Sequence, residues 1–347
     1  MTDKSKIPSE TISKIKAIRK KELAAEDLAK GIYEGNKAML AKAITLLEST
    51  KPAHFEKANT VIEKCLARPT NSIRLGITGV PGVGKSSFIE TLGKALTKKG
   101  NKVAVLAVDP TSSLSKGSIL GDKTRMETLA KDPKAFIRPS PSGSSLGGVA
   151  QKTRESIILC EAAGYNVILV ETVGVGQSEI AVHSMVDFFL LLKLSGAGDE
   201  LQGIKRGIME MADAIAINKA DGSNLENAKL AVTEFSRALH LYPPKANGWT
   251  PKVKKCSALE NTGIEEIWDM VQQFVEHTKA NGFFEKNRQR QNKNWFLQTV
   301  DEYIKQFFHQ KDTFKTEQAR LLTEIEQHKI SPFYAAKTLL DKITKEL

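Results

Sequence analysis

The feature that most constrains this chain is the glycine-rich run GVPGVGKS at residues 79–86, which has the pattern G-x-x-x-x-G-K-S. It lies between a strand-like stretch, IRLGIT, and an amphipathic stretch of helical spacing, SFIETLGKAL. In this context the glycines let backbone N–H groups turn toward phosphate oxygens, and the positive end of the following helix adds to the attraction. The pattern predicts that Lys85 reaches the β and γ phosphates of a nucleotide and that Ser86 coordinates Mg²⁺.

From about residue 71, short apolar runs alternate with helical segments. The strand-like runs are IRLGIT, KVAVLAV, AFIRP, NVILVE, DFFLLLKL, ADAIAIN and VKKCSA. Strands separated mostly by helices indicate an α/β fold with a doubly wound, mainly parallel sheet. The carboxyl ends of such strands share one edge of the sheet, and ligands bind at that edge.

Helical spacing dominates both ends of the chain. Within residues 40–47, leucine and isoleucine recur at i, i+4 and i+7, and an aromatic stripe of the same kind spans residues 296–307. We therefore predict an N-terminal helical extension over residues 1–70, a nucleotide-binding domain over 71–281 and a C-terminal helical arm over 282–347. The stripe on the arm has little core of its own, so it must pack on its own domain or on another chain.

A second motif, N-K-x-D, ends one of the buried runs at Asn218, Lys219 and Asp221. The Asp221 carboxylate can accept from both N1–H and the 2-amino group of guanine, whereas adenine offers no such pair of donors. Asn218 would support the loop, and the Lys219 stem would lie over the purine ring. Further along, Ser257 and Ala258 follow the last strand, where a backbone N–H can meet guanine O6.

Three acids follow strands beside the glycine-rich loop. Asp109 and Glu171 each stand at a predicted strand end, and Asp122 lies in a Gly/Ser-rich loop. Carboxylates at this edge are placed to hold Mg²⁺ and its water ligands. We predict metal-related roles for all three, together with Ser86.

Residues 172–180 are predicted to form a switch, because the N–H of Gly174 is placed to sense a γ-phosphate. A glutamine directly after this glycine positions water in ordinary small GTPases, and this chain has valine there instead. Either Gln177 moves in or Asp109 orients the water. Both alternatives predict slow intrinsic hydrolysis and activation by a partner.

Composition excludes several other classes. The net charge of +11 arises from 51 basic and 40 acidic residues spread along the chain, without the basic stripe interleaved with aromatics that single-strand binders carry. The three cysteines form no C-x-x-C pair, and no apolar run is long enough to span a membrane. We expect a cytoplasmic protein with no nucleic-acid or membrane partner.

The chain resembles the MeaB/ArgK-type P-loop GTPases, which are chaperones of adenosylcobalamin-dependent acyl-CoA mutases such as methylmalonyl-CoA mutase. The blocks that carry the resemblance run in order through most of residues 41–268. They are AKAITLLES, GITGVPGVGKSSFIE, VAVLAVDPTSS, GSILGDKTRM, SLGGVA, ILVETVGVGQSE, GAGDELQGIKRGI, INKAD and SALENTGIEEIW.

The resemblance implies a homodimer held by the C-terminal arm and binding of GTP or GDP with Mg²⁺. It also implies assistance to a cobalamin-dependent mutase: the GTPase would gate cofactor loading and protect the mutase from inactivation or rescue it. It also implies that residues 195–207, SGAGDELQGIKRG, form a third switch that responds to the mutase, with Lys205 as the matching lysine. Glycines there permit alternative backbone states. The charged and polar residues predicted to couple to the partner are Asp199, Glu200, Gln202, Lys205 and Arg206.

The full set of predicted nucleotide-binding residues comprises Gly79, Gly82, Val83, Gly84, Lys85, Ser86, Ser87, Gly174, Asn218, Lys219, Asp221, Ser257 and Ala258. The predicted catalytic residues are Lys85, Asp109, Glu171 and Gln177. Two alternative functions each require features of their own. A nickel metallochaperone would need clustered Cys and His ligands, and a P-loop kinase or transport ATPase would need an acceptor pocket; the sequence shows neither.

Overall fold

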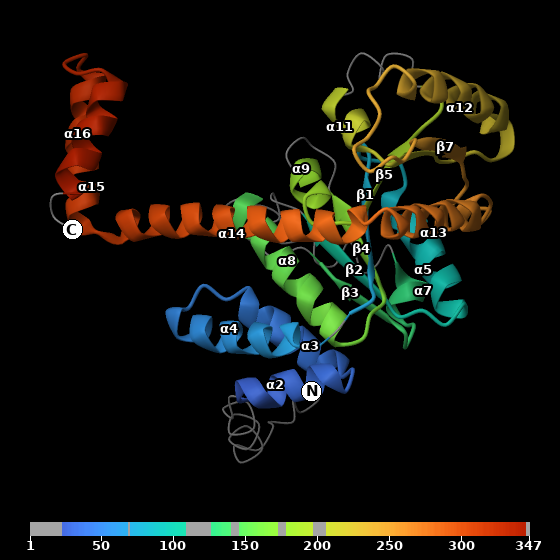
Figure 1. Ribbon diagram of the computed structural model, residues 1–347, viewed down its shortest axis with the longest axis horizontal. Helices are drawn as coiled ribbons and strands as arrows, with labels where there is room; N and C mark the ends of the chain where they lie inside the picture. The colour runs from blue at the N-terminus through green and yellow to red at the C-terminus, as the bar shows by residue number, and fades with distance from the viewer. Residues whose placement is uncertain are drawn as a thin grey trace, which may run out of the picture. The chain divides into compact units, whose positions relative to one another are not determined.

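The computed structural model describes residues 23–68, 70–108, 126–139, 146–172, 178–196 and 206–344 (Figure 1). By its internal contacts the chain divides into two units, Met1–Arg288 and Gln289–Leu347. No helix in these ranges is both long enough and apolar enough to cross a membrane.

A seven-stranded sheet forms the centre of the first unit, in the order β3-β2-β4-β1-β5-β6-β7. The strands are β1 Ile73–Thr78, β2 Val103–Val108, β3 Ala135–Arg138, β4 Val167–Thr172, β5 Phe188–Lys193, β6 Ala214–Ile217 and β7 Lys252–Lys255. Every pairing is parallel, which confirms the predicted doubly wound α/β class. All the loops that follow the strands therefore begin at one edge.

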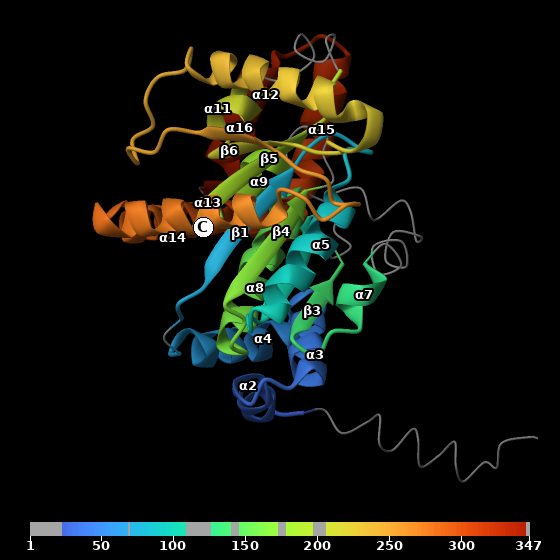
Figure 2. The ribbon, with the colours of Figure 1, turned by 90° about the vertical axis from the view of Figure 1, so that its right-hand side faces the viewer.

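Helices cover both faces of this sheet (Figures 1 and 2). This unit contains α2 Ala25–Tyr33, α3 Lys37–Leu47, α4 Pro52–Leu66, α5 Lys85–Lys98, α7 Glu127–Ala130, α8 Leu146–Ala162, α9 Ser178–His183, α11 Arg206–Met211, α12 Leu225–Leu239 and α13 Ile264–Ala280, with a short 3-10 helix at Gly222–Asn224. Because a doubly covered strand has no solvated side, β2, β4, β5 and β6 are buried along their whole lengths.

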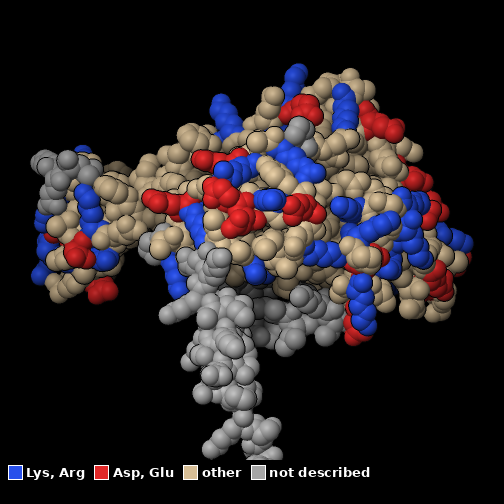
Figure 3. Space-filling model, turned by 90° about the horizontal axis from the view of Figure 1, so that it is seen from below, with Lys and Arg blue, Asp and Glu red and all other residues tan. Residues whose placement is uncertain are grey.

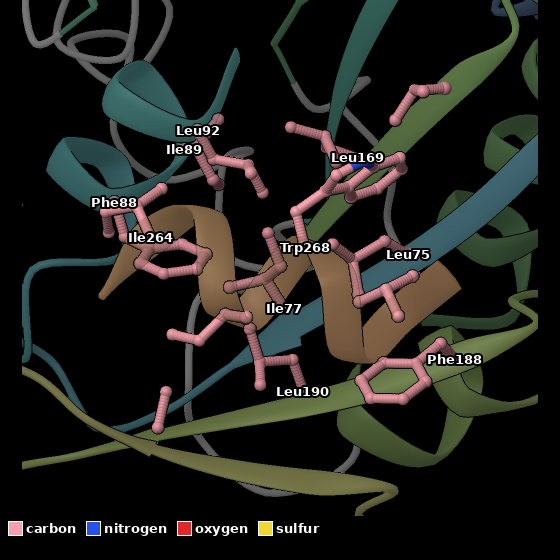
Figure 4. Close-up of a cluster of buried hydrophobic side chains, with 14 of the residues drawn as sticks. Leu75, Ile77, Phe88, Ile89, Leu92, Leu169, Phe188, Leu190, Ile264 and Trp268 are labelled. Atoms are coloured by element: carbon pink, nitrogen blue, oxygen red, sulfur yellow. The ribbon is translucent and has the colours of Figure 1, made fainter. Parts of the chain in front are cut away.

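Alternation along the strands divides the core into separate clusters. On one face, Leu75 and Ile77 of β1 pack with Phe88 of α5 and Trp268 of α13 (Figure 4). On the opposite face, strand side chains pack with α8, α9 and the N-terminal helices. A third cluster lies between β6 and α11 with α12. The glycine-rich loop is thus carried between a buried strand and a helix that is itself fixed in the core.

The predicted apolar face of the N-terminal helices is confirmed. Leu40, Ile44 and Leu47 of α3 are each at most 2% exposed and join the cluster beside α8. The helix starts where the side chain of Asn36 accepts from the N–H groups of Ala38 and Met39. These helices pack on one another and on α8, and they share its hydrophobic cluster rather than forming a separate core.

An ion pair holds the first turns of α14 (Phe283–Gln310) to the sheet. Arg288 donates to both carboxylate oxygens of Asp187 at 2.8 and 2.6 Å, and to the Ser72 carbonyl at 2.9 Å. Asp187 is almost fully buried and also accepts from the backbone N–H of Arg74 at 2.8 Å. The same carboxylate therefore accepts hydrogen bonds from the Arg288 guanidinium and from a backbone N–H of the neighbouring strand β1.

The second unit contains the rest of α14 with α15 (Asp312–Glu326) and α16 (Pro332–Thr344). The predicted C-terminal helical spacing is confirmed. Phe296 and Phe307 of the aromatic stripe are 65% and 50% exposed. Hydrogen bonds from Arg320 and Lys342 lower the pKa of Glu317 to about 2, which links α15 to α16 by charge.

We predict that Arg288→Met lowers the free energy of unfolding by about 3 kcal/mol, because it leaves the Asp187 carboxylate buried without its cation. Equilibrium unfolding in urea measures this. Lys229→Ala is the control: Lys229 pairs with Glu226 at the exposed surface, so its loss should cost less than about 0.5 kcal/mol. Equal effects of the two changes would contradict the importance assigned to burial.

Candidate nucleotide site

The glycine-rich loop joins β1 to α5 and has a backbone that only glycine fits at two points. Gly79 has φ of +153°, and an added Cβ would lie 2.6 Å from the Leu192 carbonyl oxygen. Gly84 has φ of +93°, and its Cβ would lie 2.7 Å from Asn218 Nδ2. Neighbouring elements therefore approach the loop so closely that a side chain would displace them.

The amino end of α5 is arranged to bind an anion. The helix begins at Lys85, and Gly84 at its N-cap supplies no side-chain acceptor for the first N–H groups. Those donors and the helix dipole are the features that attract a phosphate. Lys85 lies over the same loop, since its Nζ donates to the carbonyls of Gly79 at 2.8 Å and Val80 at 3.2 Å.

The N-K-x-D residues follow β6, next to the glycine-rich loop. Asn218 is 1% exposed, and its Nδ2 donates to the Val83 carbonyl at 2.8 Å. Lys219 has φ of +58°, a left-handed conformation that turns the chain sharply after the strand. The structure therefore brings the predicted phosphate loop and the predicted base motif into direct contact.

The loop after β7 lies beside Asp221. The Ser257 hydroxyl donates to Asp221 Oδ2 and accepts from the N–H of Glu260 at 3.1 Å. The backbone N–H of Ser257 donates to the Thr262 carbonyl at 2.9 Å. Of the two residues predicted to offer an N–H to the base, this leaves Ala258 as the better candidate.

Hard oxygen donors meet at the end of β4. The Ser86 hydroxyl donates to Glu171 Oε1 at 3.2 Å, and the Glu171 residue is 8% exposed. A hydroxyl and a carboxylate beside a phosphate-binding loop are ligands that Mg²⁺ takes together with phosphate and water oxygens. Within the described ranges no group of three or more His, Cys, Asp or Glu side chains converges, and a Mg²⁺ held this way does not need one.

Sequence reasoning missed a pair of hydroxyls beneath the site. Thr172 donates to Thr78 Oγ1 at 2.8 Å, and the two residues are 0% and 1% exposed. Thr78 precedes the glycine-rich loop, and Thr172 follows Glu171. The only signal in the sequence was a threonine at the end of each strand, which gains meaning once β1 and β4 are known to be neighbours.

Several predicted residues lie outside the described part of the chain. They are Asp109, Asp122, Gly174, Gln177, Asp199, Glu200, Gln202 and Lys205. Arg206 begins α11, and its side chain is likewise outside the description. Their roles stay predictions, whereas the glycine-rich loop, Glu171, the N-K-x-D motif and Ser257 are brought together at one edge of the sheet.

An all-parallel α/β sheet that carries a G-x-x-x-x-G-K-S loop between its central strand and a helix defines a P-loop nucleotide-binding protein. Comparison with known families narrows this class. Residues 40–313 match the family described as methylmalonyl Co-A mutase-associated GTPase MeaB. The chain belongs to the MeaB family, and it is accordingly a GTPase that binds guanine nucleotides.

Named relatives agree with this assignment over most of their length. A probable GTPase of Mycobacterium tuberculosis is 46% identical over 316 residues, which cover 91% of this chain and 94% of the relative. The GTPase ArgK of Escherichia coli is 45% identical over 301 residues, 87% of this chain and 91% of the relative. The mitochondrial methylmalonic aciduria type A homolog of Mus musculus is 43% identical over 331 residues, 92% of this chain and 80% of the relative.

A solved structure supports the fold. The crystal structure of a protein titled LAO/AO transport system kinase superimposes with a TM-score of 0.74 at 38% identity. The match covers 92% of this chain and 97% of that one.

We predict that Gly84→Ala lowers the free energy of unfolding by about 2 to 3 kcal/mol, because the new Cβ displaces the Asn218 amide from the Val83 carbonyl. Gly82→Ala is the matched control. Gly82 has φ of +80° but nothing within 4 Å of an added Cβ, so it should show only the backbone cost of about 1 kcal/mol. Equal losses in urea unfolding would show that the Asn218 contact is unimportant.

Proposed function

We propose that this GTPase is a chaperone of an adenosylcobalamin-dependent acyl-CoA mutase, methylmalonyl-CoA mutase being the first candidate. It would gate cofactor loading and protect or reactivate the mutase. The observation that carries this proposal is membership of a family described as associated with that mutase, over residues 40–313. The name of the Mus musculus relative, which refers to methylmalonic aciduria, is consistent with it.

In this proposal the phosphate chain binds at the amino end of α5. Backbone N–H groups of the glycine-rich loop and the first turn of α5, including those of Gly82, Val83 and Ser87, surround the phosphates. Lys85 transfers its hydrogen bonds from the loop carbonyls to the β and γ phosphates, a change that requires only rotation of a flexible stem. Its buried position supports a strong interaction, since little solvent screens the charge.

Mg²⁺ would be held by Ser86 and Glu171, with Asp109 and Asp122 as further predicted acids. The hydrogen bond between Ser86 and Glu171 supports the first two. When bound, Mg²⁺ neutralises charge that develops on the phosphates during transfer. Glu171 would hold a water molecule or the metal at the sheet edge. Either Gln177 or Asp109 would orient the attacking water. The N–H of Gly174 would respond to the γ-phosphate.

Guanine would bind between the two loops that Asn218 and Ser257 support. Asp221 accepts from the base, the Lys219 stem covers one face of the ring, and Ala258 offers its N–H to O6. The Ser257 hydroxyl holds one carboxylate oxygen of Asp221, which supports a fixed orientation before the base arrives. A preorganised acceptor loses less freedom on binding.

The segment 195–207 would couple the nucleotide to the mutase. It follows β5, and β5 lies in the sheet between β1, which leads into the glycine-rich loop, and β6, which leads into the N-K-x-D motif. Its predicted coupling residues are Asp199, Glu200, Gln202, Lys205 and Arg206. Charged residues that exchange partners between two states are one means by which such segments act.

The proposal includes a homodimer formed through the C-terminal arm. In the unit Gln289–Leu347, apolar side chains remain exposed on all three helices. Examples are Phe296, Leu297, Leu322 and Phe333, which are 65%, 50%, 52% and 84% exposed. An apolar surface of this kind on a helical arm fits association with a second copy. The division into extension, domain and arm at residues 70 and 281 belongs to the same proposal.

A cytoplasmic location also belongs to the proposal. All three cysteines are free and buried, which suits a reducing compartment. On the face drawn in Figure 3, basic and acidic side chains are interspersed, which gives no support to a nucleic-acid partner.

Asp221→Asn should weaken GTP binding at least about tenfold, because the carboxylate that accepts from two base donors is lost. The same variant should gain affinity for xanthosine triphosphate, whose 2-oxo group can accept from the new amide. Competition binding with the two nucleotides measures the change. An unaltered preference for GTP would refute the assignment of Asp221 to the base.

The chaperone role is tested by GTP turnover with and without purified adenosylcobalamin-dependent methylmalonyl-CoA mutase. The mutase should accelerate hydrolysis by the wild-type protein. Lys205→Ala should keep its intrinsic rate and lose the acceleration, whereas the exposed control Lys229→Ala should keep both. Absence of any acceleration of the wild type would contradict the proposed partner, and loss of both rates in Lys205→Ala would refute a dedicated coupling role.

A further inference from the structure

Cys256 lies directly between the edge strand β7 and the loop that holds Asp221. It is 1% exposed. Its backbone N–H donates to the Ile217 carbonyl at 2.8 Å, and its carbonyl accepts from the Ala220 N–H at 3.0 Å. The two hydrogen bonds are made to residues on either side of Asn218 in the sequence. Cys256 therefore lies beside the residue that links the base motif to the glycine-rich loop.

The orientation of the Asn218 amide is set by what surrounds it. Its Nδ2 faces the Val83 carbonyl, which can only accept a hydrogen bond. The oxygen must consequently point the other way, where the Cys256 Sγ donates to Asn218 Oδ1 at 3.6 Å. If the amide turned over, two acceptors would face each other across the contact to Val83. A donor at the position of the thiol thus selects the orientation that holds the loop.

The chemical state of the thiol suits this task. Burial raises the pKa of Cys256 to about 12, so the group stays protonated, and hence a donor, throughout the neutral range. A thiolate in the same place would repel Asn218 Oδ1. A thiol is a weak donor, but the acceptor, Asn218 Oδ1, belongs to a fully buried residue. A buried oxygen left without a donor lowers the free energy of unfolding.

We propose that Cys256 is a positioning residue for nucleotide retention: its S–H donates to Asn218 Oδ1 and so fixes the amide that holds the glycine-rich loop beside the base-binding loops. The inference rests on the proposed role of Asn218 in the nucleotide site. Cys256 itself acts through Asn218. Its loss should therefore speed the release of GDP and leave the cleavage step, at Ser86 and Glu171, largely unchanged.

The chain supplies its own matched controls. Cys65 and Cys160 are also free, and they are 1% and 0% exposed. Both lie in the cluster beside α8 and the N-terminal helices, whereas Cys256 belongs to the cluster on the opposite face with α5 and α13. Removing the sulfur of Cys160 opens a comparable small cavity without touching Asn218.

The experiment measures release of a fluorescent GDP analogue from the full chain for Cys256→Ala, Cys256→Ser and Cys160→Ala. Cys256→Ala should release GDP about tenfold faster, because Asn218 Oδ1 loses its donor. Cys256→Ser keeps a donor and should return the rate to within about threefold of the wild type, a rescue that a purely steric role would not produce. Cys160→Ala should match the wild type. Single-turnover hydrolysis of bound GTP should stay within about twofold in all three.

An unchanged release rate in Cys256→Ala, or an equal increase in Cys160→Ala, would overturn the inference. Failure of Cys256→Ser to recover any retention would do the same. These outcomes are separable from failure of the proposed function. If wild-type protein prefers GDP to ADP and responds to the mutase while Cys256→Ala releases GDP normally, only the inference fails. If Asn218→Ala also leaves release unchanged, the proposed role of Asn218 fails with it.

Discussion

The hydrogen bond from Asn218 Nδ2 to the Val83 carbonyl joins two segments that are 135 residues apart in sequence. One segment has the backbone of a phosphate-binding loop, and the other carries the N-K-x-D motif, which we propose selects the base. A nucleotide needs both at a fixed separation. The two segments lie so close at Gly84 that even a methyl group there would meet the Asn218 amide. The Asn218 hydrogen bond to Val83 therefore requires glycine at position 84. The same close packing explains both the glycine of the first motif and the asparagine of the second.

Buried aspartates at the opposite edge of the sheet hold the strands that end in these loops. Asp187 accepts from the Arg74 N–H of β1 at 2.8 Å, and Asp213 accepts from the Phe189 N–H of β5 at 2.9 Å. Each carboxylate has a cation, Arg288 in the first case and Lys245 in the second. Burying a charge is acceptable when it is paired and hydrogen-bonded. The amino edge of the sheet is thereby fixed, and the loops at the carboxyl edge are available for the proposed nucleotide.

Local patterns were sufficient to predict the strands, the parallel sheet and the phosphate loop. The seven runs correspond to β1 through β7, and those of β1 to β6 were recognisable because each is short and apolar. β7, with the sequence KVKK, is polar and mostly exposed. Contacts across the sheet could not be predicted in the same way. The Thr78–Thr172 pair and the Ser86–Glu171 contact depend on which strands are neighbours and in what register, and neither is encoded within a short window. The Cys256 thiol beside Asn218 belongs to this second group.

We propose that the carboxyl edge of this sheet forms a guanine-selective nucleotide site. Calorimetric titration of the wild-type protein with GDP and with ADP, each in the presence of Mg²⁺, tests it most directly. GDP should bind at least about 100-fold more tightly than ADP, because only guanine presents two donors to Asp221. Comparable affinities for the two nucleotides would contradict it.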